Sequence, residues 1–278
     1  MKRVKEYLIV IVPLFLLITF MLPARYHSLT FGSDDIGRSI DFLIFNGYID
    51  LIKLSFVVTI VSAIFGIVSV YVSVWCMGVK DVFEGIKNVV FGLPPLLTAL
   101  ILMKLFFEEV ETRRVGFFLI SLSFAWMMAH EGLEGRFSDL YHSTMVKAST
   151  AMGVSKFGIL FRHIIPNSVE NILTVLFDNF RFAFTLYLTI GFLGFGIPDS
   201  LGDLIGTNFL SAVGYFNYKS VLLLVFSPFL PFFHFVKAYL YEIPGKVVFI
   251  AISYVIWTVV FIRVLRVGLI RVIRSYIR

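Results

Sequence analysis

Long runs of apolar residues alternate with short clusters of charge, and this pattern constrains the fold more than any other feature of the chain. A run of about 20 apolar residues is long enough to cross the hydrocarbon core of a bilayer as a helix. Backbone N–H and C=O groups find no water there, so a crossing segment must be helical or part of a closed barrel. With 59% hydrophobic and 15% charged residues among 278, we predict an all-α, polytopic transmembrane helical bundle of about six spanning helices.

The whole chain, 1–278, is interpreted as a single membrane-spanning domain, because it contains no internal repeat and no low-complexity linker. One predicted span contains Pro94 and Pro95, which a membrane helix tolerates where neighbouring groups bond the freed carbonyls. Short polar segments join the spans, among them a charged cytoplasmic link at 80–87. The spans are predicted at about 7–22, 51–75, 89–107, 115–129, 171–196 and 247–262.

Basic residues at both ends of the chain set its predicted orientation. Lys2, Arg3 and Lys5 precede the first apolar run, and five arginines lie between positions 263 and 278. By the positive-inside rule, both termini are predicted to be cytoplasmic, in a multi-pass protein of the inner (cytoplasmic) membrane. Termini on one side require an even number of crossings. The proline-interrupted stretch at 220–240 is therefore predicted to re-enter the membrane or to lie on its surface.

Composition argues against several other classes of protein. The basic clusters adjoin apolar runs, so we attribute the net charge of +6 to the lipid bilayer and not to nucleic acid. The single Cys76 permits no intrachain disulfide and no paired-cysteine metal site. The chain contains no GxxxxGK[ST] sequence, so it is not expected to hold ATP phosphates in a P-loop. No cofactor is predicted.

The longest polar stretch between predicted spans covers 130–170, and the predicted topology places it in the cytoplasm. Within 141–167, apolar residues recur at helical spacing on both sides of Gly153, a residue that permits a sharp change of backbone direction. Ser155 is a candidate N-cap for the second helix, which Pro166 is expected to end, with Asn167 beginning the next. The two apolar sets are Met145, Ala148 and Met152, and Phe157, Leu160, Phe161 and Ile164.

Spacing alone leaves two interpretations of this helix–glycine–helix loop. Small residues at Ala148, Ser149 and Ala151 would let the first helix seat closely in a groove of a soluble partner. The same loop would equally suit an amphipathic segment that packs on lipid headgroups.

Several segments, in order along the chain, form a more specific pattern. They are Gly32-Ser-Asp34-Asp-Ile-Gly37-Arg38, Trp126, the set Lys147-Ala-Ser with Gly153 and Phe161-Arg-His-Ile-Ile-Pro-Asn167, and Gly191-Phe-Leu-Gly-Phe-Gly196. Over about 30–215, this set resembles the permeases of binding-protein-dependent ABC importers, in the oligopeptide/dipeptide/nickel subfamily. The loop resembles their EAA loop, and the first and last segments are similar to their GTDxxGRD and SFLGLG runs.

The resemblance implies a type I ABC importer permease fold and a permease subunit that imports oligopeptides, dipeptides or a related solute such as nickel. The 141–167 loop would couple closure of ATPase subunits to alternating access. Implied partners are a second homologous permease, two ATP-binding subunits, a periplasmic or lipid-anchored solute-binding protein and the lipid bilayer. The coupling residues would be Lys147, Ala148, Ser149, Gly153, Arg162, His163, Pro166 and Asn167, with Gly32, Asp34, Gly37 and Arg38 forming a segment on the periplasmic side.

The chain departs from the family in three places. Lys147 stands where the EAA motif usually has an acidic residue. The tryptophan of the family's PSWG segment is absent from Asp199-Ser-Leu-Gly-Asp203, and the apolar stretch at 220–240 has no recognised counterpart. The reversed charge at Lys147 would either disturb docking or be matched by a reversed charge on the partner.

Asp178 and Arg181 lie within the fifth predicted span, three residues apart and so on one face of a helix. Charge at membrane depth costs roughly 2.5–3.5 kcal/mol on insertion scales, so both side chains are expected to face protein or water. Two interpretations remain open: they line a translocation path and contact a charged peptide, or they form a structural pair that neutralises itself.

Two alternatives to a transporter subunit were weighed. An intramembrane enzyme, such as a metalloprotease or hydrolase, would need a convergent set of catalytic groups. His130, Glu131 and Glu134 form only an incomplete HExxH pattern, interpreted as a solvated entry to the loop with no metal. The chain is accordingly not expected to be an enzyme. A membrane scaffold of permease descent that no longer transports is the second alternative, and Lys147 is the residue that suggests it.

Overall fold

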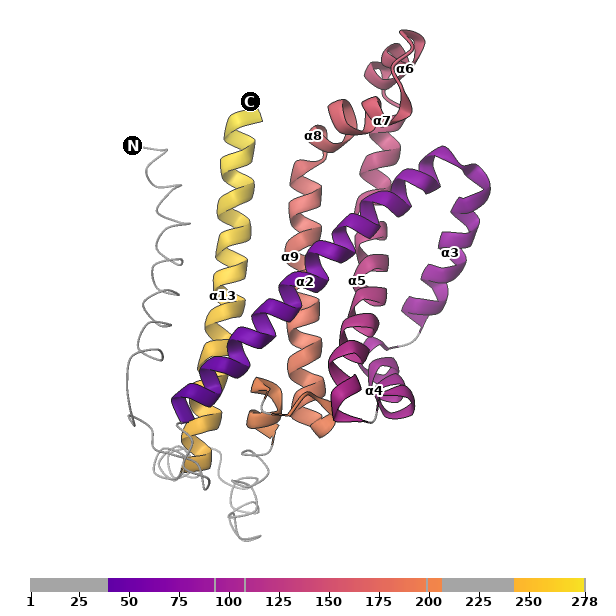
Figure 1. Cartoon of the computed structure of the whole chain (residues 1–278). Helices are drawn as coiled ribbons and strands as arrows, with labels where there is room; N and C mark the ends of the chain where they lie inside the picture. Colours follow the sequence, from indigo (N-terminus) through magenta and orange to yellow (C-terminus); the bar gives the residue numbers. More distant parts are fainter. Residues whose placement is uncertain (1–39, 93, 108, 199, 207–242, 278) are drawn as a thin grey trace, which may run out of the picture.

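The computed structural model describes residues 40–92, 94–107, 109–198, 200–206 and 243–277 (Figure 1). The predicted first span at 7–22 and the stretch at 220–240 lie outside these residues. So does the predicted periplasmic-side segment, Gly32, Asp34, Gly37 and Arg38.

The described part of the chain is helical. The first four helices are α2 (Ile40–Trp75), α3 (Met77–Gly92), α4 (Pro95–Phe106) and α5 (Val110–Tyr141). Short elements then form the 141–167 loop, namely α6 (Thr144–Ala151), α7 (Lys156–Ile159), the π-helical turn η1 (Leu160–Ile164) and α8 (Ile165–Asn167). The chain continues as α9 (Val169–Ile190), the π-helical turn η2 (Gly191–Phe195), a short helix at 201–206 and α13 (Ile243–Ile277).

Within the described residues, three helical stretches have the length and apolar character needed to cross a bilayer: Leu43–Trp75, Glu111–Tyr141 and Val169–Phe195. The bent pair Val79–Gly92 and Pro95–Phe106 would add a fourth if it counts as one span. The all-helical, membrane-spanning class is therefore confirmed. The predicted span at 247–262 falls inside α13. About six spans were predicted, and the described residues account for three or four of them.

The predicted link at 80–87 and the predicted span at 89–107 are both wrong in their boundaries. Helix α3 already begins at Met77, so the charged residues of 80–87 are helical. The helix ends at Gly92, and α4 leaves it at an angle of 87°. Pro94 has extended backbone angles, φ −58° and ψ 121°, as expected for a residue that precedes another proline. The sequence pattern predicted one continuous span at 89–107, but the Pro94-Pro95 pair interrupts the helix there.

The fourth predicted span, 115–129, is too short. Helix α5 runs to Tyr141, so residues 130–141 belong to a long helix and not to the polar loop. Ala129, Leu133 and Phe137 are buried at four-residue spacing along this extension. Polar residues occupy its other faces and conceal that apolar stripe from a search for uninterrupted apolar runs.

Helix α2 crosses α5 and α9 at a close contact (Figure 1). A Cβ atom built on Gly66 of α2 would lie 2.5 Å from Cβ of Ala129 in α5, so this contact depends on small residues. Asn179 of α9 is buried in the same region, where its Nδ2 donates to Ser62 Oγ (2.8 Å) and to the carbonyl of Ala125 (3.0 Å). One amide thereby joins three helices.

The segment 191–206 folds back on the end of α9 opposite the 141–167 loop (Figure 1). Gly194 adopts φ +81°, a conformation that favours glycine. A Cβ on Gly202 would lie 2.5 Å from the carbonyl oxygen of Leu188 and 2.9 Å from Cα of Gly191. These glycines therefore let two backbones touch, which explains the glycines of the family-like run Gly191–Gly196 in physical terms.

We expect Gly202→Ala to destabilise the folded chain by about 1–3 kcal/mol, because the added methyl group overlaps backbone atoms that cannot move aside. The check is the midpoint of thermal unfolding in detergent, which should fall. Gly135→Ala is the matched control, since a Cβ at Gly135 meets nothing within 4 Å. Equal midpoints for the two variants would contradict this account of the contact.

Candidate functional site

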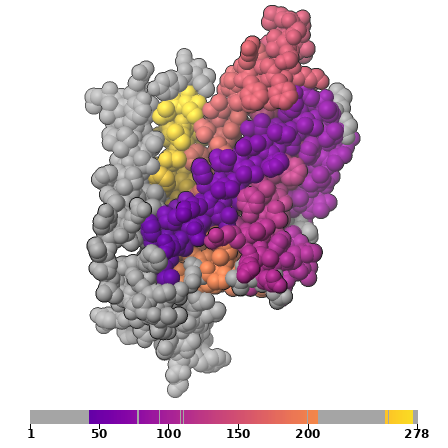
Figure 2. Space-filling model, in the orientation of Figure 1, coloured from indigo at the N-terminus to yellow at the C-terminus, as the bar shows by residue number. Residues whose placement is uncertain are grey.

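The 141–167 loop projects beyond the ends of the long helices (Figure 1), and it protrudes from the surface in the space-filling view (Figure 2). The end of α13 lies at the same end of the bundle. The loop is therefore the part of the described chain that extends farthest from the bundle on that side.

Local interactions define the turn at the centre of the loop. Gly153 has φ +80°, as expected for the residue that reverses the chain between α6 and α7. Ser155 Oγ accepts a hydrogen bond from the backbone N–H of Gly158 (3.2 Å), which confirms its predicted N-cap role. Ser143 caps α6 in the same way by accepting from Val146 N–H at 3.4 Å.

The helix continues one residue past the stop predicted at Pro166, through η1 into α8, which ends at Asn167. Helix α9 starts at Val169 after Ser168, so Asn167 does not begin it. Asn167 instead donates from Nδ2 to the carbonyl of His163 (2.6 Å).

The inner face of the loop is part of a hydrophobic core. Val146, Ile159, Leu160 and Ile164 are buried in a cluster completed by Val70 of α2, Ala129, Leu133 and Phe137 of α5, and Val175 of α9. Three long helices thus hold the loop by buried apolar contacts. Such packing resists movement of the loop relative to the helices.

Aromatic side chains fasten the loop further, and the sequence patterns did not reveal them. Trp75 packs edge-on against Tyr141 (ring centroids 4.6 Å apart), and Tyr71 lies 5.5 Å from Phe157. Lys156 Nζ lies 4.9 Å above the Trp75 ring. The last two turns of α2 therefore contact both the start of the loop and α7 near its middle.

The outer face of the loop is apolar and exposed. Met152 is 76% exposed and Phe157 is 63% exposed, and Met145, Ala148 and Phe161 also face outward. The apolar set predicted for the first helix, Met145, Ala148 and Met152, thus lies on the exposed side. Its buried side is formed by Val146 and Ser149.

The exposed face is also basic. Lys147 and Arg162 are exposed, and no acidic residue occurs in the sequence between Asp139 and Glu170. Of the predicted coupling residues, Ala148, Gly153, Pro166 and Asn167 are exposed as well. Ser149 is buried and His163 is partly buried. Ser149 Oγ and His163 Nε2 lie 3.3 Å apart and join α6 to η1.

Asp178 has a closer partner than the one predicted. Its Oδ1 lies 3.8 Å from Arg181 but accepts a hydrogen bond from Arg266 Nη1 of α13 at 2.8 Å. Glu170 and Arg274 form a second ion pair between the same two helices. Glu170 and Asp178 are eight residues apart in α9, as Arg266 and Arg274 are in α13. This equal spacing is the signal from which the antiparallel pairing could have been found.

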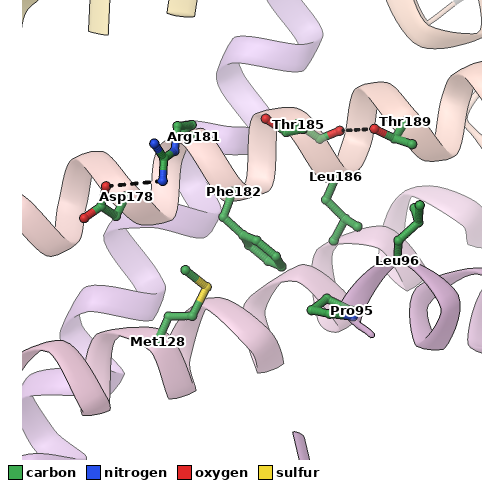
Figure 3. Close-up of a pocket in the computed structure, with 9 residues that line it drawn as sticks. All are labelled: Pro95, Leu96, Met128, Asp178, Arg181, Phe182, Thr185, Leu186 and Thr189. Carbon is green, nitrogen blue, oxygen red and sulfur yellow. Dashed lines mark hydrogen bonds and ion pairs between the residues drawn. The ribbon is translucent and has the colours of Figure 1, made fainter. Parts of the chain in front are cut away.

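A groove of about 420 Å³ runs along α9 beside Asp178 and Arg181 (Figure 3). Phe182 and Leu186 point from α9 toward α5 and α4 in this view. Asp178 and Arg181 therefore both line this groove. The lining is completed by Pro95, Leu96, Met128, Thr185 and Thr189.

His130 is not at a solvated loop entry, as the sequence suggested, but is buried. Its Nδ1 lies 2.9 Å from Ser69 Oγ of α2, and its ring stacks on Phe83 of α3 with centroids 4.9 Å apart. Glu134 lies one turn along α5, with Oε2 3.9 Å from Nε2. Among the described residues, no three His, Cys, Asp or Glu side chains come together as metal ligands would. The histidine joins three helices.

The chain is similar to several known permease proteins. It is 27% identical over 189 residues to the peptidoglycan transport system permease protein YejE of Agrobacterium fabrum, over 65% of this chain and 48% of that protein. Identity to the inner membrane ABC transporter permease protein YejE of Escherichia coli is 26% over 211 residues, 73% of this chain and 60% of that protein. Identity to the oligopeptide transport system permease protein OppC of Bacillus subtilis is 23% over 200 residues, which cover 71% of this chain and 64% of that protein.

The chain is thus a distant homologue of permease subunits of ABC transporters. Such membrane subunits are not themselves enzymes. Of the three, OppC is named for oligopeptides and the Agrobacterium YejE for peptidoglycan. Similarity to such permeases confirms the resemblance drawn from the sequence motifs. The chain spans less than two thirds of the length of each of these three relatives. No protein-family model matches it.

We expect Asp178→Asn to destabilise the chain by about 1 kcal/mol, because it removes the carboxylate that Arg266 and Arg181 share. Arg266→Gln should cost a similar amount, and the double variant less than the two together. The measurement is a double-mutant cycle on unfolding midpoints in detergent. Strictly additive effects would contradict a coupling between Asp178 and Arg266.

Proposed function

We propose that this chain is a transmembrane permease subunit of an ATP-driven ABC importer for peptides, located in the inner membrane with both termini in the cytoplasm. The observation that carries the proposal is the 141–167 loop, whose inner face is anchored in the core and whose outer face exposes Met152 and Phe157. An exposed apolar surface on a projecting loop suits contact with another protein. The similarity to an ABC transporter permease and to an oligopeptide permease suggests the class of partner.

In this proposal the loop docks in a cleft of an ATP-binding subunit, and closure of two such subunits moves the loop. Buried contacts of Ile159 and Ile164 would pass that movement to α2, α5 and α9. A second homologous permease would complete the path, and a periplasmic or lipid-anchored solute-binding protein would deliver the peptide. None of the three relatives described is named for nickel, so peptides are the solute we propose.

The loop was predicted either to dock on a soluble partner or to pack on lipid headgroups. The position of its exposed apolar side chains distinguishes the two. A loop lying on headgroups would place its apolar side chains toward the bundle end and the bilayer. The loop that carries the exposed apolar residues instead extends beyond the helix ends (Figure 1), which favours a protein partner. A scaffold without transport activity would retain the fold but show no coupled ATP hydrolysis.

Gly153→Pro should abolish peptide-stimulated ATP hydrolysis by the complex, purified from the native host through a tag on this chain. Proline cannot adopt φ +80°, so the turn between α6 and α7 must change. Thr144→Pro is the matched control, because position 144 is the first residue of α6 and follows an extended Ser143. It should retain ATPase subunits and stimulation. If wild-type protein purifies without an ATP-binding subunit, or both variants behave alike, the coupling role is wrong.

The reversed charge at Lys147 generates a second prediction. We expect Lys147→Glu to lower the amount of ATP-binding subunit that co-purifies by about tenfold, because the basic outer face requires an acidic cleft on the partner. Raising the salt concentration should also weaken retention by the wild type. Arg271→Glu, an equal change at an exposed site on α13, is the control and should change neither. Unchanged retention by Lys147→Glu would show that docking does not depend on this charge.

A further inference from the structure

A polar stripe runs along one side of α9 at membrane depth. Asp178, Arg181, Thr185 and Thr189 recur at intervals of three and four residues and lie along the groove (Figure 3). Opposite them, the groove is lined by apolar side chains of α4 and α5, including Pro95 and Met128. Thr189 Oγ1 donates to the carbonyl of Thr185 within the helix, so it is the charged side chains of Asp178 and Arg181 that must face water or protein.

The charged groups around the stripe include more cations than anions, because α13 adds Arg266. Asp178 is the carboxylate shared by Arg266, at 2.8 Å, and Arg181, at 3.8 Å. Among the residues that the structure describes, two guanidinium groups therefore share one carboxylate, which gives this cluster a net charge of +1. The Arg181 side chain is the more exposed of the two arginines, at 63% against 33% for Arg266.

The position of Arg181 makes this charge significant. It lies about 18 Å along the helix axis from Val169, the start of α9. The membrane-spanning stretch of α9 and η2 ends at Phe195, so Arg181 stands near its middle. A cation there is costly unless it meets an anion or water, and such residues commonly mark the path of a substrate.

We propose that Arg181 binds a carboxylate of the transported solute, the C-terminal carboxylate of a peptide in the first instance. Its planar guanidinium group is suited to bidentate contact with a carboxylate. Thr185, exposed one turn farther along, offers a hydroxyl group, and the side chains of Phe182 and Met128 offer an apolar wall for the rest of the solute. This inference rests on the proposed function, because it assumes that the groove belongs to a peptide path.

The test uses the intact complex in proteoliposomes and a matched pair of probes, trialanine and its C-terminal amide. The quantity measured is the ratio of kcat/KM for ATP-driven uptake of the acid to that of the amide. Arg181 is expected to contribute a factor of about ten to that ratio in the wild-type complex. Arg181→Gln should therefore lower the ratio about tenfold from its wild-type value, by reducing uptake of the acid while sparing the amide. Arg271→Gln, a matched change away from the groove, should leave the ratio as in the wild type.

The design separates Arg181 from the solute-binding protein, which contributes the same factor to the ratio in wild type and variant. Arg181→Lys should retain part of the preference, and it provides the comparison if Arg181→Gln fails to assemble.

An unchanged ratio in Arg181→Gln overturns this inference and leaves the proposed function intact. Equal loss of both peptides also overturns it, because Arg181 would then pair with an acidic group of the second permease. Failure of wild-type complex to take up either peptide overturns both proposals.

Discussion

The close contact of α2, α5 and α9 is the constraint on which the other features of the described structure depend. Gly66 and Ala129 bring two backbones together, and Asn179 ties the third helix to the other two by hydrogen bonds. In lipid, apolar surface drives little association between helices, so close packing and internal hydrogen bonds must supply it. The 141–167 loop connects α5 to α9, and the groove lies between the same two helices and α4. Loop and groove are thus placed by one set of contacts.

Helix α9 joins these two regions directly. It leaves the loop at Val169 and carries Asp178 and Arg181 within the next four turns. Ion pairs with Arg266 and Arg274 fix α13 against the same helix, so α9 and α13 form one unit. A force applied to the loop would reach the groove through packed side chains and a rigid helix. This is the physical basis for linking a partner's movement to access for a solute.

Much of this arrangement could be predicted from the sequence, and the failures have physical causes. Apolar runs located α2, α5 and α9, and Gly153 and Ser155 located the turn in the loop, because each signal is local. The extension of α5 to Tyr141 was missed because Leu133 and Phe137 form a narrow apolar stripe among polar residues. The partner of Asp178 was missed because Arg266 lies 88 positions away, and only tertiary packing brings them together. His130 was misjudged for the same reason, since Ser69 and Phe83 come from other helices.

The central claim, that the loop contacts an ATP-binding subunit, is tested most directly by site-specific cross-linking. A photo-reactive amino acid placed at Phe157 would be activated in the native host's membranes and the captured protein sequenced. The same residue at Val82, which is exposed on α3, serves as the reference position. Our account predicts that Phe157 captures a subunit containing a P-loop and that Val82 does not. Capture of lipid alone at Phe157, or of the same proteins at both positions, would contradict it.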